Sequence, residues 1–292
     1  MKRKMRKNKT RTHKVQNAGP SLFSLAGKTA LITGGAGYFG KEFVRGLLDS
    51  GARVIVIEKP EVGYEVRDSF KGEYPGRTFW HEVNLFDEKA TDKVYTKILK
   101  EHQVDILINN AFVFGSQTGF YLRRRETIKS ATHDEFRNAF EAGIWWAVQS
   151  TKKFGLAMKE RGGGSIINIT SSLGVIAPSP TTYEGFKHSI NPPAYSVVKA
   201  GLLHWTRYSA SFLAPVRVNA LSPGAIPNLK EGHHKAGKEY DDGFLPSLAK
   251  KMVLSRCGKV HELVGPLIFL ASDASSYVTG HNLLVDGGWT VI

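Results

Sequence analysis

The chain has 292 residues, of which 41% are hydrophobic, and its formal net charge at pH 7 is +14. This length and composition allow a large buried core, and no linker rich in proline, glycine or serine divides the chain after residue 20. We therefore expect one domain over residues 21–292. The single cysteine, Cys257, excludes an intrachain disulfide and a cysteine-based metal cluster, and the ten histidines show no metal-binding spacing, so we expect no metal.

The first 14 residues carry eight positive charges and no acidic residue. A segment of this composition has no apolar face to bury, so residues 1–20 are predicted to form a basic, disordered tail. A solvated extension is the simpler interpretation, and binding to nucleic acid or another acidic surface is the alternative. The sequence shows neither a secretory h-region nor an apolar run of membrane-spanning length, which predicts a soluble, cytoplasmic protein without a membrane partner.

Short apolar runs rich in β-branched residues alternate with longer stretches of helical spacing. The expected strands are residues 29–33, 53–58, 78–83, 106–109, 165–169, 217–221 and 282–285. The expected helices include residues 88–100, 134–159 and 195–212. This alternation favours an α/β fold in which helices cover both faces of a parallel sheet. Ligands bind such sheets at the carboxyl ends of the strands.

A glycine-rich turn with the sequence TGGAGYFG follows the first expected strand and opens a helix. Its glycines Gly34, Gly37 and Gly40 permit a tight turn and a close approach of the backbone to a pyrophosphate at the helix N-terminus. A purely structural turn would use the same residues, so the assignment to a dinucleotide site needs a second feature.

Glu58 is that second feature. It ends the second expected strand 18 residues after Gly40, near the spacing at which an acidic residue binds the ribose hydroxyls of adenosine. A carboxylate at this place repels the additional phosphate of NADP. The sequence therefore favours NAD(H) over NADP, although the adjacent Lys59 weakens the discrimination.

Three residues predict proton transfer to and from a carbonyl oxygen. The phenol of Tyr195 has an ordinary pKa of about 10 and needs help to exchange a proton near neutrality. Lys199 lies one helical turn later on the same face, and its charge, together with that of an oxidised nicotinamide, favours the phenolate. Ser171 lies just beyond the strand of residues 165–169 and could hydrogen-bond the substrate oxygen.

Tyr183 and Lys187 have the same spacing as this pair, so the Y-x-x-x-K pattern alone does not choose between them. The two prolines at 192–193 prevent a helix from running through them, whereas the helical pattern that Tyr195 opens is uninterrupted. Because only the second pair has a rigid helix to hold its geometry, we assign catalysis to that pair.

In this order the motifs resemble the short-chain dehydrogenase/reductase family, over nearly all of the chain from Leu22 onwards. Other matching pieces are the Asn-Asn-Ala sequence at 109–111, NITSS from Asn168, YSVVK, RVNALSPG from Arg217, and ASDASSYVTG with VDGG near the C-terminus. The resemblance implies a Rossmann-type, doubly wound α/β domain with a mostly parallel, seven-stranded sheet, usually in a homo-oligomer. It also implies that Ser171, Tyr195 and Lys199 are the catalytic residues.

The resemblance further implies which residues bind the cofactor. They are Gly34, Gly37, Tyr38, Phe39, Gly40, Glu58, Asn84, Leu85, Asn110, Ala111, Tyr195, Lys199, Pro223, Gly224 and Ile226. Among these, Asn84 replaces the usual aspartate near the adenine, and the last three lie beside the nicotinamide half.

Two departures from the family pattern lie close to the predicted catalytic residues. Phe112 replaces the usual glycine after Asn-Asn-Ala. The family's helix asparagine, which supports a proton relay to the active-site lysine, aligns near Ala142 and Gly143, where this chain has none. Water or another side chain, such as Asn138, would have to serve in its place, or activity would be reduced or lost.

The substrate side also departs from the family. Tyr195 follows Ser171 by 24 residues, which indicates an insertion within residues 178–193 at the substrate mouth. The arginines at 123–125 are either part of a solvated loop or a site for a substrate phosphate or carboxylate. Residues 228–250 are polar and are predicted to form a mobile lid.

The favoured function is therefore an NAD(H)-dependent oxidoreductase that interconverts a secondary alcohol and a ketone on a polar small molecule such as a sugar derivative. The inserted loop resembles that of family members acting in surface-sugar and nonulosonate pathways. Two alternatives remain open: a 3-oxoacyl-carrier-protein-type reductase, and a non-catalytic regulator that binds the cofactor.

Overall fold

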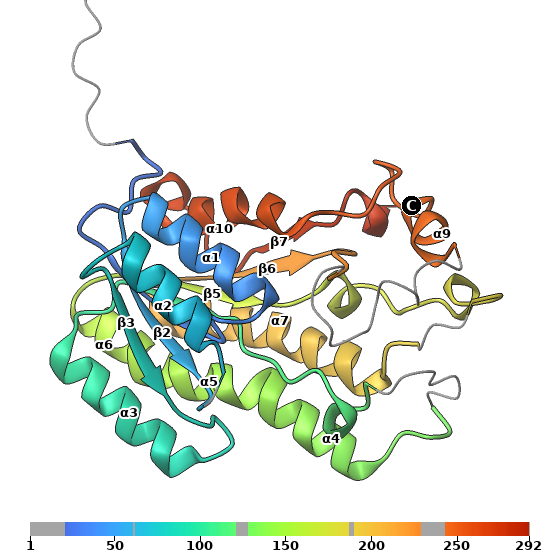
Figure 1. The fold of residues 1–292 in the computed structure, drawn as a ribbon, viewed down its shortest axis with the longest axis horizontal. Helices are drawn as coiled ribbons and strands as arrows, with labels where there is room; N and C mark the ends of the chain where they lie inside the picture. Colours follow the sequence, from blue (N-terminus) through green and yellow to red (C-terminus); the bar gives the residue numbers. More distant parts are fainter. Residues whose placement is uncertain (1–20, 61, 121–127, 187–189, 229–242, 292) are drawn as a thin grey trace, which may run out of the picture.

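The computed structural model describes residues 21–60, 62–120, 128–186, 190–228 and 243–291 (Figure 1). The sequence predictions for the basic tail, for the arginines at 123–125, for Lys187 and for most of the lid therefore lie outside the described residues.

Seven parallel strands form one sheet in the order β3-β2-β1-β4-β5-β6-β7 (Figure 1). They are β1 (Thr29–Thr33), β2 (Arg53–Glu58), β3 (Thr78–Glu82), β4 (Ile106–Asn109), β5 (Ser165–Ile169), β6 (Arg217–Pro223) and β7 (Asn282–Val285). The predicted doubly wound, parallel sheet is confirmed. The order reverses beside β1, so the crevice that binds ligands in such sheets opens where β1 and β4 end.

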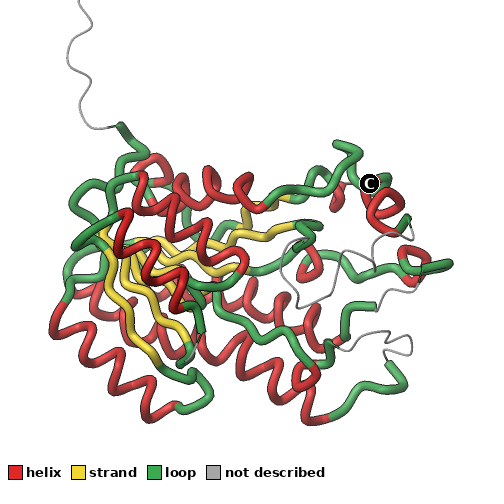
Figure 2. Tube along the Cα trace, viewed as in Figure 1, coloured by secondary structure: helices red, strands yellow, loops and turns green. Residues whose placement is uncertain are grey.

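Side chains alternate between the two faces of the sheet, and each face has its own apolar core. On one face Ile32 and Val56 pack against Phe43 and Leu267, which come from α1 (Tyr38–Asp49) and α10 (Val264–Ala271). Helix α2 (Tyr64–Glu73) covers the same face through Phe70. Figure 2 shows these helices on one side of the strands.

On the opposite face Leu31 and Ile55 pack against Tyr95 and Phe154. The covering helices are α3 (Glu88–Glu101), α5 (Trp146–Ser150), α6 (Leu156–Glu160) and α7 (Pro193–Leu213), and α4 (His133–Phe140) packs against α7. Because helices cover both faces, a ligand can approach the sheet at the ends of its strands, as the sequence predicts.

The segment predicted as one helix over residues 134–159 is helical throughout but is not uniform. Two π-helical turns, η2 (Glu141–Trp145) and η3 (Thr151–Gly155), separate α4, α5 and α6. Such wide turns inside α-helices are frequent at functional sites. Here η2 contains Gly143, the position where the family asparagine is missing.

Helix α7 begins at Pro193, two residues before Tyr195. Proline suits the first helical position because its missing N–H would have no partner there and its fixed φ already fits a helix. The helix that carries Tyr195 and Lys199 is present as predicted, but it begins two residues earlier than the expected start at Tyr195, with the second proline as its first residue. No helix within the described residues is both long and apolar enough to cross a membrane.

Candidate active site

The glycine turn connects β1, at the centre of the sheet, to α1. Gly34 has φ +69°, and a Cβ there would lie 3.0 Å from the Cα of Ala111. A Cβ at Gly40 would meet the Gly34 carbonyl oxygen at 2.0 Å. Since only glycine fits these two positions, the turn leaves its backbone N–H groups at the N-terminus of α1 open to a ligand.

The end of β4 is hydrogen-bonded to this turn. The hydroxyl of Thr33 accepts from the backbone N–H groups of Asn110 (3.2 Å) and Ala111 (3.1 Å). In return the side-chain amide of Asn110 donates to the carbonyl oxygens of Gly34 (2.9 Å) and Thr33 (3.1 Å). Thus two predicted cofactor residues, far from the turn in sequence, lie against it.

The carboxylate of Glu58 also reaches the turn. One oxygen accepts from the backbone N–H of Ala36 and the other from that of Lys59, both at 3.0 Å. Burial raises the pKa of Glu58, and these two N–H groups partly offset the rise. The acidic group is therefore held beside the glycine turn by the backbone, with lone pairs left for further donors.

The remaining predicted cofactor residues surround the same end of the sheet. Asn84 is exposed after β3, with its side-chain oxygen accepting from the N–H of Phe86 at 3.2 Å. By contrast, the side chains of Leu85 and Phe39 belong to the two apolar cores. These two residues could therefore contact a cofactor mainly through their backbone.

Tyr38 links the glycine turn to the segment after β6. Its hydroxyl donates to the carbonyl oxygen of Pro227 at 3.0 Å. Pro223 is the last residue of β6, and Gly224 and Ile226 lie on the segment that follows. The N–H of Gly224 donates to the carbonyl oxygen of Val285 of β7 at 3.0 Å. The two sides of the predicted cofactor cleft are therefore joined by a hydrogen bond.

Lys199 and Tyr195 occupy one face of α7, next to the end of β5. The ammonium of Lys199 donates to the Ile169 carbonyl oxygen at 2.9 Å and lies 5.7 Å from the Tyr195 ring centroid. Lys199 is 4% exposed, and burial lowers its pKa to about 7. Burial raises the pKa of Tyr195, while a hydrogen bond with Ser171 lowers it.

This environment defines the resting protonation of the site. Ser171 is buried, and its oxygen also accepts from the N–H of Leu173 at 3.1 Å. Because burial disfavours both phenolate and ammonium, Tyr195 carries its proton in the unliganded site. A protonated phenol beside a serine hydroxyl can donate to a ketone oxygen. The structure thus brings together the three residues predicted to be catalytic.

Three phenylalanines surround the Tyr195 ring, a feature that the sequence did not predict. The centroids of Phe112 and Phe120 each lie 5.4 Å from that of Tyr195, and Phe114 lies at 6.0 Å. We call Phe112, Phe114 and Phe120 the aromatic cluster. The sequence showed only that Phe112 replaces a glycine. The contacts of the three rings with Tyr195 depend on how the loop after β4 packs against α7.

A side chain at Gly143, one of the two positions near which the family asparagine is expected to align, would crowd its neighbours. A Cβ at Gly143 would lie 2.6 Å from a methyl carbon of Val198 and 3.3 Å from the Phe112 ring. Asn138, considered above as a replacement, donates its amide to the Gln117 carbonyl oxygen at 3.0 Å. Its side chain holds the loop after β4 and is not bonded to Lys199.

The competing tyrosine, Tyr183, lies in a different cluster. Its ring stacks on Phe244 of α9 (Phe244–Ala249) at 5.8 Å, and its oxygen accepts from the Asn191 amide at 3.2 Å. The inserted segment is therefore packed against the described end of the predicted lid. Lys187 is outside the described residues, so the structure does not test whether Tyr183 and Lys187 lie close together.

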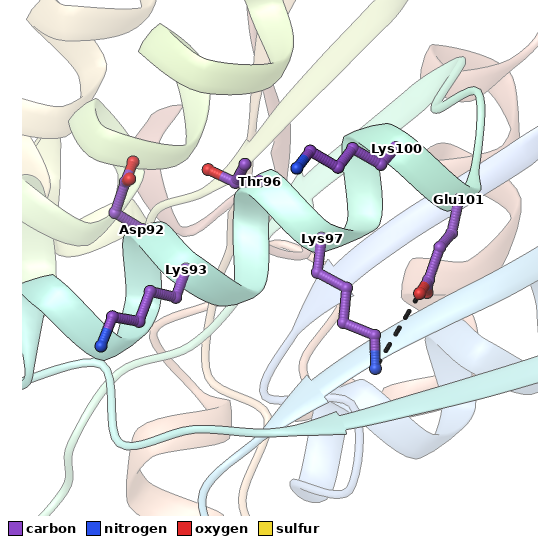
Figure 3. A pocket seen from close by; sticks show the side chains of 6 residues that line it. All are labelled: Asp92, Lys93, Thr96, Lys97, Lys100 and Glu101. Carbon is purple, nitrogen blue, oxygen red and sulfur yellow. Dashed lines mark ion pairs between the residues drawn. The ribbon is translucent and has the colours of Figure 1, made fainter.

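The outer face of α3 carries a hollow of about 460 Å³ that shares no residue with the predicted site (Figure 3). Figure 3 shows Lys97 turned toward Glu101, with 3.9 Å between the nitrogen and the nearest carboxylate oxygen. The other lining residues are Asp92, Lys93, Thr96 and Lys100. Charged side chains along one helix face are typical of a solvated surface.

One group of possible metal ligands occurs among the described residues. The ligand atoms of His81, Glu101 and His102 lie within 4.8 Å of one another, between β3 and the end of α3. None of the three is a predicted catalytic or cofactor residue, and Lys97 adds a positive charge beside them. The absence of a metal requirement stays a prediction.

Comparisons with known proteins agree with this geometry. A family model described as enoyl-(acyl carrier protein) reductase matches residues 36–290. The NAD-dependent glycerol dehydrogenase of Listeria innocua is 30% identical over 92% of this chain and 96% of its own length. The 2-dehydro-3-deoxy-D-gluconate 5-dehydrogenase of Bacillus subtilis is 29% identical over 91% of this chain and 96% of its own length.

A solved structure of a related dehydrogenase has the same fold. It is described as an NAD(P)-dependent gluconate 5-dehydrogenase from Beutenbergia cavernae with bound NADP, and it superposes with a TM-score of 0.79. The identity is 29%, and the match covers 94% of this chain and all of the other. The chain therefore belongs to the short-chain dehydrogenase/reductase family of NAD(P)-dependent oxidoreductases.

Proposed function

We propose that this protein is an NAD(H)-dependent dehydrogenase/reductase that interconverts a secondary alcohol and a ketone on a polar small molecule such as a polyol or a sugar acid. The observation that carries the proposal is the convergence of Ser171, Tyr195 and Lys199 at the end of β5. The glycine turn and Asn110 lie at the ends of neighbouring strands β1 and β4.

The reaction uses these side chains to move one proton. In the reducing direction Tyr195 breaks its O–H bond and gives the proton to the ketone oxygen, which Ser171 holds by a hydrogen bond. The positive charge of Lys199 lies near the phenolate that is left and stabilises it. In the oxidising direction the same phenolate takes the proton of the alcohol. When bound, the nicotinamide cofactor supplies or accepts the hydride.

The Glu58 carboxylate supports NAD(H) as the cofactor. Hydrogen bonds from two backbone N–H groups fix the carboxylate beside the glycine turn, so its side chain stays close to a ligand bound there. A fixed negative charge favours two ribose hydroxyls and disfavours a phosphate. Among the relatives, the Listeria enzyme is named as NAD-dependent, whereas the Beutenbergia structure holds NADP.

The relatives support a polar substrate. Glycerol and 2-dehydro-3-deoxy-gluconate, the substrates that their names give, are both rich in hydroxyl groups. The description of the matching family model favours the acyl-carrier alternative, because it names an acyl carrier protein substrate. The intact catalytic residues argue against a regulator without turnover. The cytoplasmic location stays a prediction from the sequence.

An exposed apolar face supports a homo-oligomer, with a second copy of this chain as the partner. On α7, Tyr208 is 53% and Phe212 61% exposed, and their ring centroids are 4.6 Å apart. Phe136 and Phe140 on the adjacent α4 are exposed as well. Exposed aromatic side chains on a helix surface are typical of an interface with another protein chain.

A substrate panel tests the proposed function. Polyols and sugar acids would be assayed with NAD, and the matching keto compounds with NADH, by following NADH absorbance. Acetoacetyl and enoyl thioesters of the acyl carrier protein form the second arm, and Tyr195→Phe is the blank. Turnover in the first arm that is lost in the variant supports the proposal. Turnover restricted to the thioesters would establish the alternative, and NADH binding without turnover would establish the regulator.

A further inference from the structure

The side chain of Phe112 lies between the catalytic pair and the π-helical turn η2. Its ring centroid is 5.0 Å from the ammonium nitrogen of Lys199 and 5.4 Å from the Tyr195 centroid. The rings of Phe112 and Tyr195 meet edge to face at 76°. One aromatic ring therefore contacts both residues that move the proton.

Gly143 provides the space for this ring. A Cβ at position 143 would come within 3.3 Å of the ring atom Cε2 of Phe112 and 2.6 Å of a Val198 methyl carbon. The phenylalanine and the glycine are thus complementary, because the large side chain on the loop fills the space that a side chain on η2 would need.

Among the residues that the structure describes, Lys199 has the following neighbours. From β5 the Ile169 carbonyl oxygen accepts a hydrogen bond from the Lys199 ammonium at 2.9 Å. From α7 the Tyr195 ring centroid lies at 5.7 Å, and from the loop after β4 that of Phe112 lies at 5.0 Å. Gly174 packs against its backbone from the turn Ser172–Gly174. Tyr195 is the titratable group among these contacts, and burial is the cause that lowers the pKa of Lys199.

The aromatic ring acts on the ammonium in two opposing ways. By keeping water away it disfavours the charged form, and by presenting its face it favours that form through a cation–π interaction. Burial lowers the pKa of Lys199 to about 7, against 10.5 for a free lysine side chain, which is the direction that exclusion of water gives.

We propose that Phe112 is a positioning residue for Lys199: its ring closes the η2 side of the ammonium to water and holds the ammonium against Tyr195. The inference deepens the proposed function and rests on it for the role of Lys199. Its consequence is that protons reach the catalytic pair from the substrate and cofactor side, because the helix side is filled by an apolar ring.

Two substitutions separate the two effects of the ring. Phe112→Gly opens the space to water, so the pKa of Lys199 is expected to rise by about one unit or more. Phe112→Leu keeps water out but removes the aromatic face, so the pKa of Lys199 is expected to fall below that of the wild type. The matched control is Phe114→Gly, which removes another ring of the aromatic cluster that has no contact with Lys199 among those described.

The measurement follows the Cε resonance of Lys199 in protein labelled with ¹³C-lysine, with Lys199→Met to assign the signal. It needs no turnover, so it stands even if the proposed function fails. The pH profile of kcat with NADH is the second readout, and its Lys199-dependent limb should shift with the resonance. A substitution that only loosened the fold would lower kcat equally at every pH.

Opposite shifts for the Gly and Leu variants, with Phe114→Gly unchanged, support the inference. It is overturned if Lys199 titrates as in the wild type in both Phe112 variants, or if Phe114→Gly reproduces the shift. Should Phe112→Gly not fold, Phe112→Leu compared with Phe114→Leu gives the same decision. A shifted resonance in a protein without turnover on any substrate would uphold the inference and refute the proposed function.

Discussion

The side-chain amide of Asn110 donates to the carbonyl oxygen of Gly34 at 2.9 Å, across the crevice at which the strand order reverses. The same amide reaches Thr33 at 3.1 Å. The ends of β1 and β4, which lie on opposite sides of this crevice, are thereby fixed relative to each other before any ligand binds. Preorganisation of this kind lowers the entropy lost on binding.

Asn110→Ala should therefore weaken both the fold and cofactor binding. The carbonyl groups of Thr33 and Gly34 each lose this donor, although that of Gly34 keeps a longer bond from the Gly37 N–H at 3.3 Å, and the loss is expected to destabilise the protein by about 1–3 kcal/mol and to reduce NADH affinity. Thermal unfolding and calorimetric titration measure the two effects. Asn138→Ala removes an exposed amide bonded to the Gln117 carbonyl and is the control, with little change expected in NADH affinity.

Tyr195→Phe is expected to lower kcat on the order of 10²–10⁴-fold, because it removes the proton that the substrate oxygen receives, while NADH binding is nearly unchanged. Tyr183→Phe removes only a hydroxyl bonded to Asn191 within an apolar cluster, so most of the turnover should remain. Steady-state kinetics on both variants decides between them. An essential Tyr183 with a dispensable Tyr195 would refute the assignment of the catalytic helix.

Glu58→Ala should narrow the preference for NADH. In the wild type NADH is expected to bind at least about tenfold more tightly than NADPH, because the carboxylate beside the glycine turn repels a phosphate on the ribose. Calorimetry with both cofactors measures the ratio. Glu65→Ala, an exposed acidic residue on α2, is the matched control. Equal affinities in the wild type would contradict the proposed cofactor.

Lys199→Met should stabilise the unliganded protein, and more so at low pH. Burial lowers the lysine pKa to about 7 from the free value of 10.5. Between these two values the unfolded chain binds more protons than the folded one, so this group makes stability rise with pH. Below about pH 7 both states are charged and the full penalty of burial remains, on the order of a few kcal/mol.

Denaturant titrations at several pH values measure this difference. The gain in unfolding free energy from Lys199→Met should be largest below neutrality. It should shrink as the pH rises toward the pKa of a free lysine side chain, 10.5. A gain that is independent of pH would show that Lys199 is not held in the low-polarity site described here.

Phe212→Glu should yield a protein of monomer mass in light scattering, because a charge would replace a ring that is 61% exposed in the single chain and proposed to pack against a second copy. Tyr277→Glu changes a fully exposed aromatic residue outside α4 and α7, and should leave the assembly intact. Wild-type protein of monomer mass would overturn the proposed homo-oligomer.

Most of the sheet was predictable from the sequence because its five inner strands are largely buried on both faces. Five of the expected strands have the observed bounds, whereas β3 ends one residue earlier, at Glu82, and β6 continues to Pro223. Such strands are short apolar runs with clear ends, which sequence patterns detect well.

The details around the site were less predictable, since they arise from contacts between distant segments. The spacing of Tyr195 and Lys199 could be seen, but the ring of Phe112 beside them depends on a loop whose shape follows from Thr118, which donates to the Val113 carbonyl oxygen at 2.7 Å. Likewise the π-helical turn at Gly143 has no sequence signature. The complementarity of Phe112 and Gly143 is visible only in three dimensions.

The strand order has a consequence for how the chain acquires its structure. β1 is central, and its pairing partner on one side is β4, with Ala30 opposite Ile106. During synthesis β1, β2 and β3 can associate early, but the other edge of β1 stays unpaired until β4 has been made. An open edge of this kind is a template for association with other chains. Parallel pairing over long separations also forms slowly. We therefore expect slow refolding in vitro, with aggregation as the main competing reaction at high protein concentration.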